Sequence, residues 1–192
     1  MRRTLLLLLP FAVLAALALA RAGDEPSADG PEYTADGQLK FPGNYREWVF
    51  LTSGLGMTYG APSAQPDDTP KFDNVFVNRA AYRGFLATGH WPDKTIFVLE
   101  IRASQSKGSI NNGGHFQTGA VAREVHVRDD RRFRGQWGFF GFEHEEGAAK
   151  QIPISASCYS CHEQHGTVDT TFVQFYPTLL KVAKEKGTFV ER

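Results

Sequence analysis

Alternating hydrophobic and polar residues mark several stretches of the chain, a pattern typical of β-strands with one buried side. The clearest stretch is TIFVLEIR, in which Phe97, Leu99 and Ile101 fall on one side. Similar runs elsewhere are bounded by glycine, proline, asparagine or aspartate. The pattern predicts strands over residues 48–53, 74–77, 95–102, 116–128 and 137–142.

The predicted strand over residues 116–128 has two different sides. Val125 and Val127 share one side, and Glu124 and His126 share the other. Polar residues that share one side of a strand most commonly face solvent. Periodicity alone therefore predicts that Glu124 and His126 are exposed.

Three segments show features of helices instead. Residues 79–88 place apolar side chains three and four positions apart, between Asn78 as a candidate N-cap and Gly89 as a terminator. Further helices are predicted over residues 155–164 and 170–187. The predicted fold class is α+β: a mainly antiparallel β-sheet with a crossing helix and a C-terminal helical segment.

The first residues are typical of a secretory signal peptide. Two arginines precede an apolar run, and Ala20-Arg21-Ala22 resembles a cleavage site. The run is slightly short for a membrane span of ~20 residues. We expect a cleaved leader over residues 1–22 rather than an anchor, then a flexible polar arm over residues 23–40, and one domain over residues 41–192.

The charge balance bears on possible partners. The chain has 21 lysines and arginines and 21 aspartates and glutamates. Removal of the leader takes away three arginines, and 21 less three leaves 18 basic residues against 21 acidic ones. Because no basic surplus remains to neutralise phosphates, we predict no nucleic-acid partner. We also predict that the mature protein is not embedded in a membrane.

The only two cysteines lie in the pentapeptide CYSCH. This C-x-x-C-H spacing is the attachment signature of c-type haem. On a helical turn Cys158 and Cys161 share one side, so both thiols can reach one edge of the macrocycle, and His162 can become the proximal iron ligand. Export favours this interpretation, because bacterial attachment of c-type haem occurs outside the cytoplasmic membrane.

Other interpretations of CYSCH stay open. Cys158, Cys161, His162 and His165 could bind zinc, although four ligands within eight residues are unusual for a structural zinc site. A redox disulfide is possible in an oxidising compartment, but the thioredoxin-like context is absent. The spacing could also be accidental.

Methionine usage bears on the sixth iron position. No methionine follows CYSCH, and Met57 is the only one after the leader. We expect Met57 to be a gap-filling side chain, because it could reach the iron only if the fold brought it there. The sequence therefore favours a high-spin haem with an open sixth position over a methionine–histidine electron carrier.

Six stretches occur in order along the chain: NYREWVFLTSGLG, FDNVFVN, TGHWPDKT, IFVLEI, SKGSINNGG and CYSCHEQHGTVDTTFVQFYPTLL. From about residue 41 to residue 184 the sequence thereby resembles the cytochrome P-460 family, which includes the cytochromes c′-beta. The resemblance implies a periplasmic, mainly antiparallel β fold, usually homodimeric, that holds one haem c. It makes Cys158 and Cys161 the thioether cysteines and His162 the proximal ligand.

Members of that family differ in their chemistry. True cytochromes P-460 oxidise hydroxylamine and carry a lysine bonded to the haem edge, whereas cytochromes c′-beta lack the bond and bind small gases at an apolar distal side. The resemblance places Leu99 at the position of the lysine, and leucine cannot form the bond. Together with Phe97 and Ile101, Leu99 would form an apolar distal wall that favours nitric oxide or carbon monoxide.

The resemblance also matches Glu124 to a distal carboxylate, which contradicts the solvent-facing placement from periodicity. The residues and the resemblance together predict a haem protein that binds a small gas, exchanges electrons with a periplasmic redox partner, or does both. One alternative is oxidation of hydroxylamine or a related nitrogen compound, with Glu124 as the catalytic base. The other is a six-coordinate electron carrier with Met57 or His126 as the sixth ligand.

The remaining histidines are expected at the surface or in supporting roles: His90, His115, His144 and His165.

Overall fold

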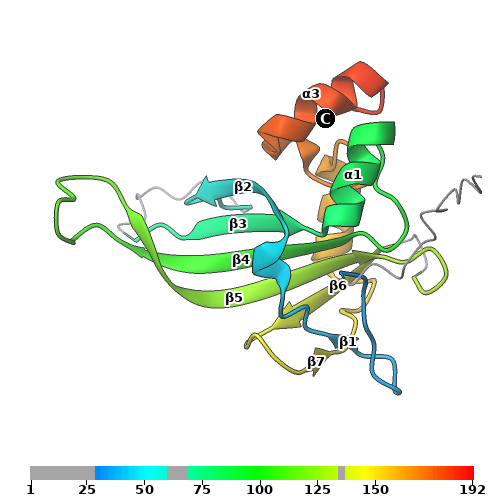
Figure 1. The fold of residues 1–192 in the computed structure, drawn as a ribbon, viewed down its shortest axis with the longest axis horizontal. Coiled ribbons are helices and arrows are strands. Elements are labelled where there is room, and N and C mark those ends of the chain that lie inside the picture. The colour runs from blue at the N-terminus through cyan, green and yellow to red at the C-terminus, as the bar shows by residue number, and fades with distance from the viewer. Residues whose placement is uncertain (1–28, 60–68, 134–136) are drawn as a thin grey trace, which may run out of the picture.

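The computed structural model describes residues 29–59, 69–133 and 137–192. Five strands form one antiparallel sheet in the order β2-β3-β4-β5-β6, and two short strands pair as a second sheet (Figure 1). The predicted signal peptide, residues 1–22, lies outside the described residues. The elements are β1 (Leu39–Lys40), β2 (Val49–Leu55), β3 (Phe72–Val77), α1 (Arg79–Thr88), β4 (Ile96–Gln105), β5 (Phe116–Arg128), β6 (Trp137–Phe142), β7 (Ala148–Ala149), α2 (Ser157–His165) and α3 (Pro177–Lys186), with 3-10 turns at Tyr45–Glu47 and Val173–Phe175.

This architecture confirms the predicted α+β class and all five predicted strands. Each neighbouring pair in the large sheet is antiparallel. Strands β4 and β5 continue beyond their neighbours as a long hairpin, which projects from the body of the molecule (Figure 1). Among the described residues, no helix has the length and apolar character needed to cross a membrane.

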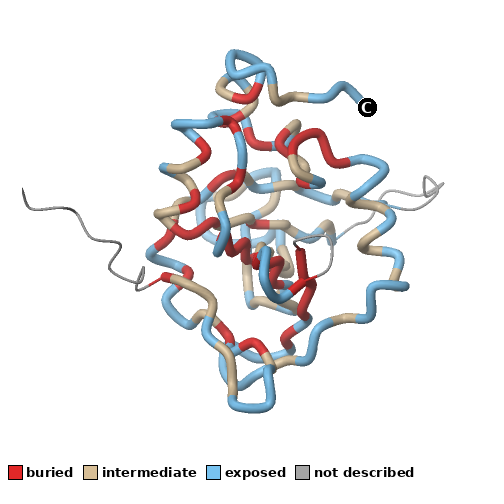
Figure 2. The backbone as a smooth tube through the Cα atoms, turned by 90° about the vertical axis from the view of Figure 1, so that its right-hand side faces the viewer, coloured by how far each residue is buried: buried red, intermediate tan, exposed pale blue. Residues whose placement is uncertain are grey.

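Each face of the large sheet is covered by a separate hydrophobic core. On one face, α1, α3 and the segment before α3 pack against strand residues (Figure 1). On the other face, the N-terminal segment from residue 39 to 48 packs against alternate residues of β4, β5 and β6. Figure 2 shows the buried positions concentrated in the interior of the fold. The alternation of side chains in strands explains the two cores, because neighbouring residues face opposite ways.

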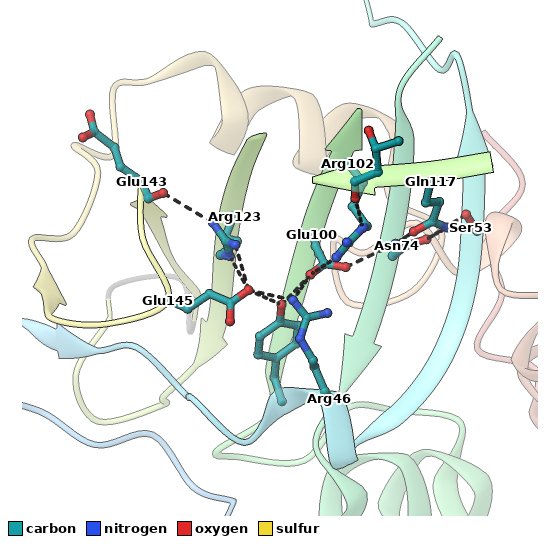
Figure 3. Close-up of polar contacts among 11 residues, drawn as sticks. Arg46, Ser53, Asn74, Glu100, Arg102, Gln117, Arg123, Glu143 and Glu145 are labelled. Atoms are coloured by element: carbon teal, nitrogen blue, oxygen red, sulfur yellow. Dashed lines mark hydrogen bonds and ion pairs between the residues drawn. The ribbon is translucent and has the colours of Figure 1, made fainter. Parts of the chain in front are cut away.

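The face covered by the N-terminal segment also contains a buried carboxylate, Glu100, whose side chain is 2% exposed (Figure 3). Its oxygens accept hydrogen bonds from Tyr45 at 2.6 Å and from Asn74 at 3.3 Å. They also pair with Arg46 at 2.5 Å and Arg102 at 3.1 Å. Burial raises the pKa of this carboxyl, but the bonds from Arg46, Tyr45 and Arg102 outweigh that effect and lower it to about 2.

Part of the segment predicted to be a flexible arm is ordered. Residues 23–28 are outside the described residues. Tyr33 forms a β-bridge with Leu39, and Leu39 is buried in the core on the side of the N-terminal segment. The polar composition of the arm hid one strongly buried leucine, which pairs with Ala149 in the small sheet.

Helix α1 has the predicted bounds, but α2 spans Ser157–His165 rather than residues 155–164, and the last helix also differs. The predicted helix over residues 170–187 is a 3-10 turn followed by α3, which begins at Pro177 and ends before Gly187. The residue before a proline is disfavoured in the α conformation, and Tyr176 has φ −108° and ψ 87°. Asn78 precedes α1 as predicted but does not cap it. Its side chain accepts a hydrogen bond from the Ile96 backbone N–H at 3.0 Å instead.

Candidate haem site

A cavity of about 490 Å³ lies between the α3-covered face of the sheet and α2. This volume falls within the range of about 300–1,000 Å³ that is common for small-molecule sites. A smaller cavity of about 130 Å³ beside Leu39 and Phe41 is remote from the cysteines. Side chains around the larger cavity are mainly apolar and include Val75, Phe97, Leu99, Phe139, Ile152, Phe172, Phe175 and Tyr176.

The CYSCH motif forms the helical wall of this cavity. It lies on α2, as predicted, and Cys158, Cys161 and His162 all line the cavity. Both cysteines are half-buried and free, so the structure contains no disulfide between them. None of the side chains of α2 is fully buried. Tyr159 ties the helix to the sheet through a hydrogen bond that its hydroxyl accepts from the Phe139 backbone N–H at 3.4 Å.

The ring of His162 has a defined orientation and tautomer. Its Nδ1 lies 2.8 Å from the backbone oxygen of Thr170, which can only accept a hydrogen bond. Nδ1 therefore carries the proton, and Nε2 keeps its lone pair for a metal. Burial lowers the pKa of His162, and the Thr170 bond opposes this only partly. A neutral imidazole with one nitrogen held by a carbonyl is the usual state of a metal-binding histidine.

His126 contradicts the exposure that periodicity predicts for it. It is buried, and its ring stacks on Phe139 at 3.9 Å between centroids and meets the ring of His162 at 4.8 Å. Its Nε2 is buried and has no hydrogen-bond partner. Burial, and secondarily the nearby His162, lowers its pKa well below the usual value. A buried polar atom without a partner in a cavity wall fits a site that receives a further polar group.

The residues of this wall fall into register across the strands. Phe97 pairs with His126, and Leu99 pairs with Glu124 in the next row along the same face. Phe97 is buried, and its ring contacts Trp91 at 4.7 Å. It therefore belongs both to the core and to the cavity wall. Leu99 is half-buried and lines the cavity. Of the three predicted wall residues, Phe97 and Leu99 therefore lie at the site, whereas Ile101 is not among the cavity-lining residues.

Glu124 is exposed, as periodicity predicts, and it also lines the cavity. Desolvation raises its pKa. Asp73 on β3 lines the same cavity, and its pKa is raised by desolvation and then by the charge of Glu124. Tyr59 is also a lining residue. Asp73 and Tyr59 were not predicted at the site, although strand alternation puts Asp73 on the same side as Val75.

Met57 also lines the cavity, so the fold brings it to the site despite its distance in sequence. The glycine at position 54 gives room to this side chain, because a Cβ atom there would collide with the sulfur of Met57. Met57 is therefore not simply a gap-filling residue of the core.

The other histidines lie elsewhere. His115 is on the β4–β5 hairpin near Ser104, and it is not among the cavity-lining residues. His144 and His165 are exposed. His90 is exposed and pairs with Asp169 at 2.9 Å. Within the described ranges, no three histidine, cysteine or acidic side chains form a group that could hold a metal ion, so the zinc hypothesis gains no ligand cluster.

Comparisons with known proteins agree with the site. A search of curated proteins found no match. The family model for Cytochrome P460 matches residues 42–173, a range that includes the five-stranded sheet, CYSCH and all of the cavity-lining residues except Phe175 and Tyr176. The family implies a haem cofactor, and the cavity, the thiols and His162 fit that group. On this match, the chain belongs to the cytochrome P460 family.

Proposed function

We propose that this protein is an exported c-type cytochrome that binds a small gas such as nitric oxide at one haem and exchanges electrons with a periplasmic redox partner. Cys158 and Cys161 would hold the haem covalently, and His162 would be its proximal ligand. The observation that carries this proposal is that a preset His162 and Leu99 line one mainly apolar cavity. The resemblance matches Leu99 to the family's cross-linking lysine.

Each of these residues has a definite task. The haem supplies an iron that can bind a diatomic gas and change its oxidation state. His162 presents a neutral Nε2, because its Nδ1 proton is engaged by Thr170. Phe97 and Leu99 exclude water from the wall and offer no hydrogen bond to a bound ligand. Such a wall favours nitric oxide or carbon monoxide over oxygen, which depends more on polar support.

Export and assembly complete the proposal. Proteins of the cytochrome P460 family are generally periplasmic or secreted, which agrees with the predicted leader over residues 1–22. We propose that the leader is cleaved and that the mature protein is a homodimer. Neither surface charge nor sequence indicates a nucleic-acid partner.

The absorption spectrum of the dithionite-reduced protein, produced in a periplasm with haem-maturation machinery, tests the proposal. We expect a broad high-spin spectrum that converts to a new species when nitric oxide is added at equimolar concentration. In His162→Ala, haem should stay covalently attached while the spectrum changes. A colourless protein, or a His162→Ala spectrum identical to that of the wild type, would contradict the proposed site.

Glu124 and Asp73 favour a second candidate function, the oxidation of hydroxylamine or a related nitrogen compound. Desolvation raises the pKa of both carboxyls, which makes their ionised forms stronger proton acceptors than carboxylates in water. Leu99 argues against this function, because it replaces the cross-linking lysine. Turnover of hydroxylamine with an electron acceptor, lost in Glu124→Gln, would establish the enzyme instead of the gas-binding protein.

Met57 favours the third candidate, a six-coordinate electron carrier. Sharp, split low-spin bands in the reduced wild type would indicate a sixth protein ligand. Conversion of those bands to a high-spin spectrum in Met57→Leu would identify that ligand as the methionine sulfur.

A further inference from the structure

The carbonyl group that fixes His162 belongs to an unusual turn. Thr170 and Asp169 are both in the left-handed region, with φ of 59° and 46°. The flanking residues Val168 and Thr171 form an antiparallel bridge, so Asp169 and Thr170 are the two central residues of a tight turn. Two central residues with positive φ are the pattern of a type I′ turn, which normally takes Asn-Gly.

The sequence at this turn opposes its conformation. A β-branched residue with positive φ is a steric outlier, and Thr170 is such a residue. The turn also lies tightly against the end of α2, since a Cβ atom at Gly166 would collide with the backbone of Thr170 and lie 2.6 Å from the His162 oxygen. Contacts from outside the turn must therefore hold it in place.

Asp169 makes those contacts. Its Oδ2 accepts a hydrogen bond from the Trp91 backbone N–H at 2.9 Å, and its Oδ1 lies 2.9 Å from His90 Nδ1. A guanidinium nitrogen of Arg128 lies 3.6 Å from Oδ2 of Asp169. Trp91 also donates its indole N–H to Thr171 at 2.8 Å, and both of these residues are 1% exposed. The turn is thus held by contacts at Asp169 and Thr171, on both sides of Thr170.

We propose that Asp169 is a positioning residue for the iron ligand: it holds the Thr170 carbonyl on His162 Nδ1 and thereby sets the electron donation of His162 to the iron. This inference rests on the proposed role of His162. A carbonyl that accepts the Nδ1 proton increases the basicity of the other ring nitrogen. Stronger donation stabilises ferric iron, so the bond to Thr170 should lower the reduction potential and strengthen the iron–histidine bond.

The test uses full-length holoprotein with the variants Asp169→Ala and Asp169→Asn. We expect Asp169→Ala to shift the iron–histidine stretch in resonance Raman spectra of the ferrous protein to lower frequency, and to raise the reduction potential. Asp169→Asn keeps one acceptor for Trp91 and should lie between Asp169→Ala and the wild type. Adding Thr170→Gly to Asp169→Ala relieves the steric conflict and should move both readouts back toward the wild type.

The matched control is Asp130→Asn. The Asp130 side chain accepts a hydrogen bond from the same Arg128 at 3.0 Å, but it has no hydrogen bond to Asp169, Thr170 or Thr171. The substitution Asp130→Asn removes a neighbouring negative charge without loosening Thr170. The iron–histidine stretch should therefore stay at the wild-type frequency. A merely structural role for Asp169 would lower the melting temperature without moving the band.

The outcomes separate the two proposals. If Asp169→Ala and Asp169→Asn both retain haem and leave the band and the potential unchanged, the positioning role is wrong. If Asp169→Ala does not fold, Asp169→Asn alone decides by the same two readouts. If the spectrum of His162→Ala is identical to that of the wild type, His162 is not the iron ligand. The proposed site is then wrong, independently of the results for Asp169.

Discussion

Glu100 and Glu124 lie on neighbouring strands but on opposite faces of the sheet. Glu100 pairs across the strands with Arg123, and Glu124 pairs with Leu99. Glu100 has a partner for each oxygen, and its pKa falls to about 2 (Figure 3). Glu124 faces an apolar cavity, where desolvation raises its pKa. The two residues are of the same type, and they differ in their hydrogen-bond and ion-pair partners. These partners make Glu100 a carboxylate that stabilises the fold, whereas Glu124 is available for chemistry.

The largest expected difference between the faces is in stability. Glu100→Ala would leave Arg46 and Arg102 without their buried partner, and breaking a buried ion pair costs about 3–5 kcal/mol. Arg46 is 46% exposed and can regain hydration, so we expect a loss of about 3 kcal/mol in the free energy of unfolding. Chemical denaturation of the holoprotein measures this loss. Glu124→Ala is the control, with an expected change within about 0.5 kcal/mol; equal losses in both variants would refute the distinction.

The second expected difference is in the pH dependence of stability. Folding lowers the pKa of Glu100 from 4.5 to about 2, so the ionised carboxylate stabilises the fold above pH 4.5, and this contribution is lost as the pH falls toward 2. This loss in the free energy of unfolding is at most about 3 kcal/mol. In Glu100→Gln the dependence of stability on pH should be flatter over this range. Folding raises the pKa of Glu124, so its ionisation opposes folding as the pH rises. Denaturation curves between pH 2 and 7 should therefore keep the acid slope in Glu124→Gln, and a loss of that slope would contradict the assignment to Glu100.

The smallest expected effect concerns His126, whose buried Nε2 has no partner. Replacing an unsatisfied buried polar group with an apolar one of similar size is close to neutral or stabilising. We expect His126→Leu to change the free energy of unfolding of the holoprotein by less than about 1 kcal/mol. A loss close to that of Glu100→Ala would mean that Nε2 of His126 forms a bond with the cofactor in the holoprotein. His126 would then resemble Glu100 in having a partner that stabilises the fold.

Much of the fold follows from local pattern. Alternation in TIFVLEIR and in residues 116–128 predicted both central strands, because each has a buried side with a period of two. The same alternation correctly separated Val125 and Val127 from Glu124 and His126. It could not say that both faces are covered, since a side that faces a cofactor cavity resembles a side that faces solvent. His126 is the clearest case, with 8% exposure where the pattern predicted an exposed residue.

The site itself was predictable only in part. The spacing of CYSCH predicted the helix and the shared location of Cys158, Cys161 and His162, because these depend on local geometry. Local alternation puts Asp73 on the same side as Val75, but it does not show that this side faces a cavity. Met57 follows the end of β2 and reaches the cavity through the fold, which no local signal encodes. Asp169 was equally hidden, since it lies between the helices predicted over residues 155–164 and 170–187, and no local signal indicated a left-handed turn there.

The weak anchoring of α2 bears on the order in which the protein is assembled. A helix without a fully buried side chain can leave the sheet without opening either hydrophobic core. The two cores can therefore form while CYSCH is still accessible to the enzymes that would attach haem. Once attached, the macrocycle would supply the apolar contacts that the helix lacks, so the cofactor itself would close the last part of the fold.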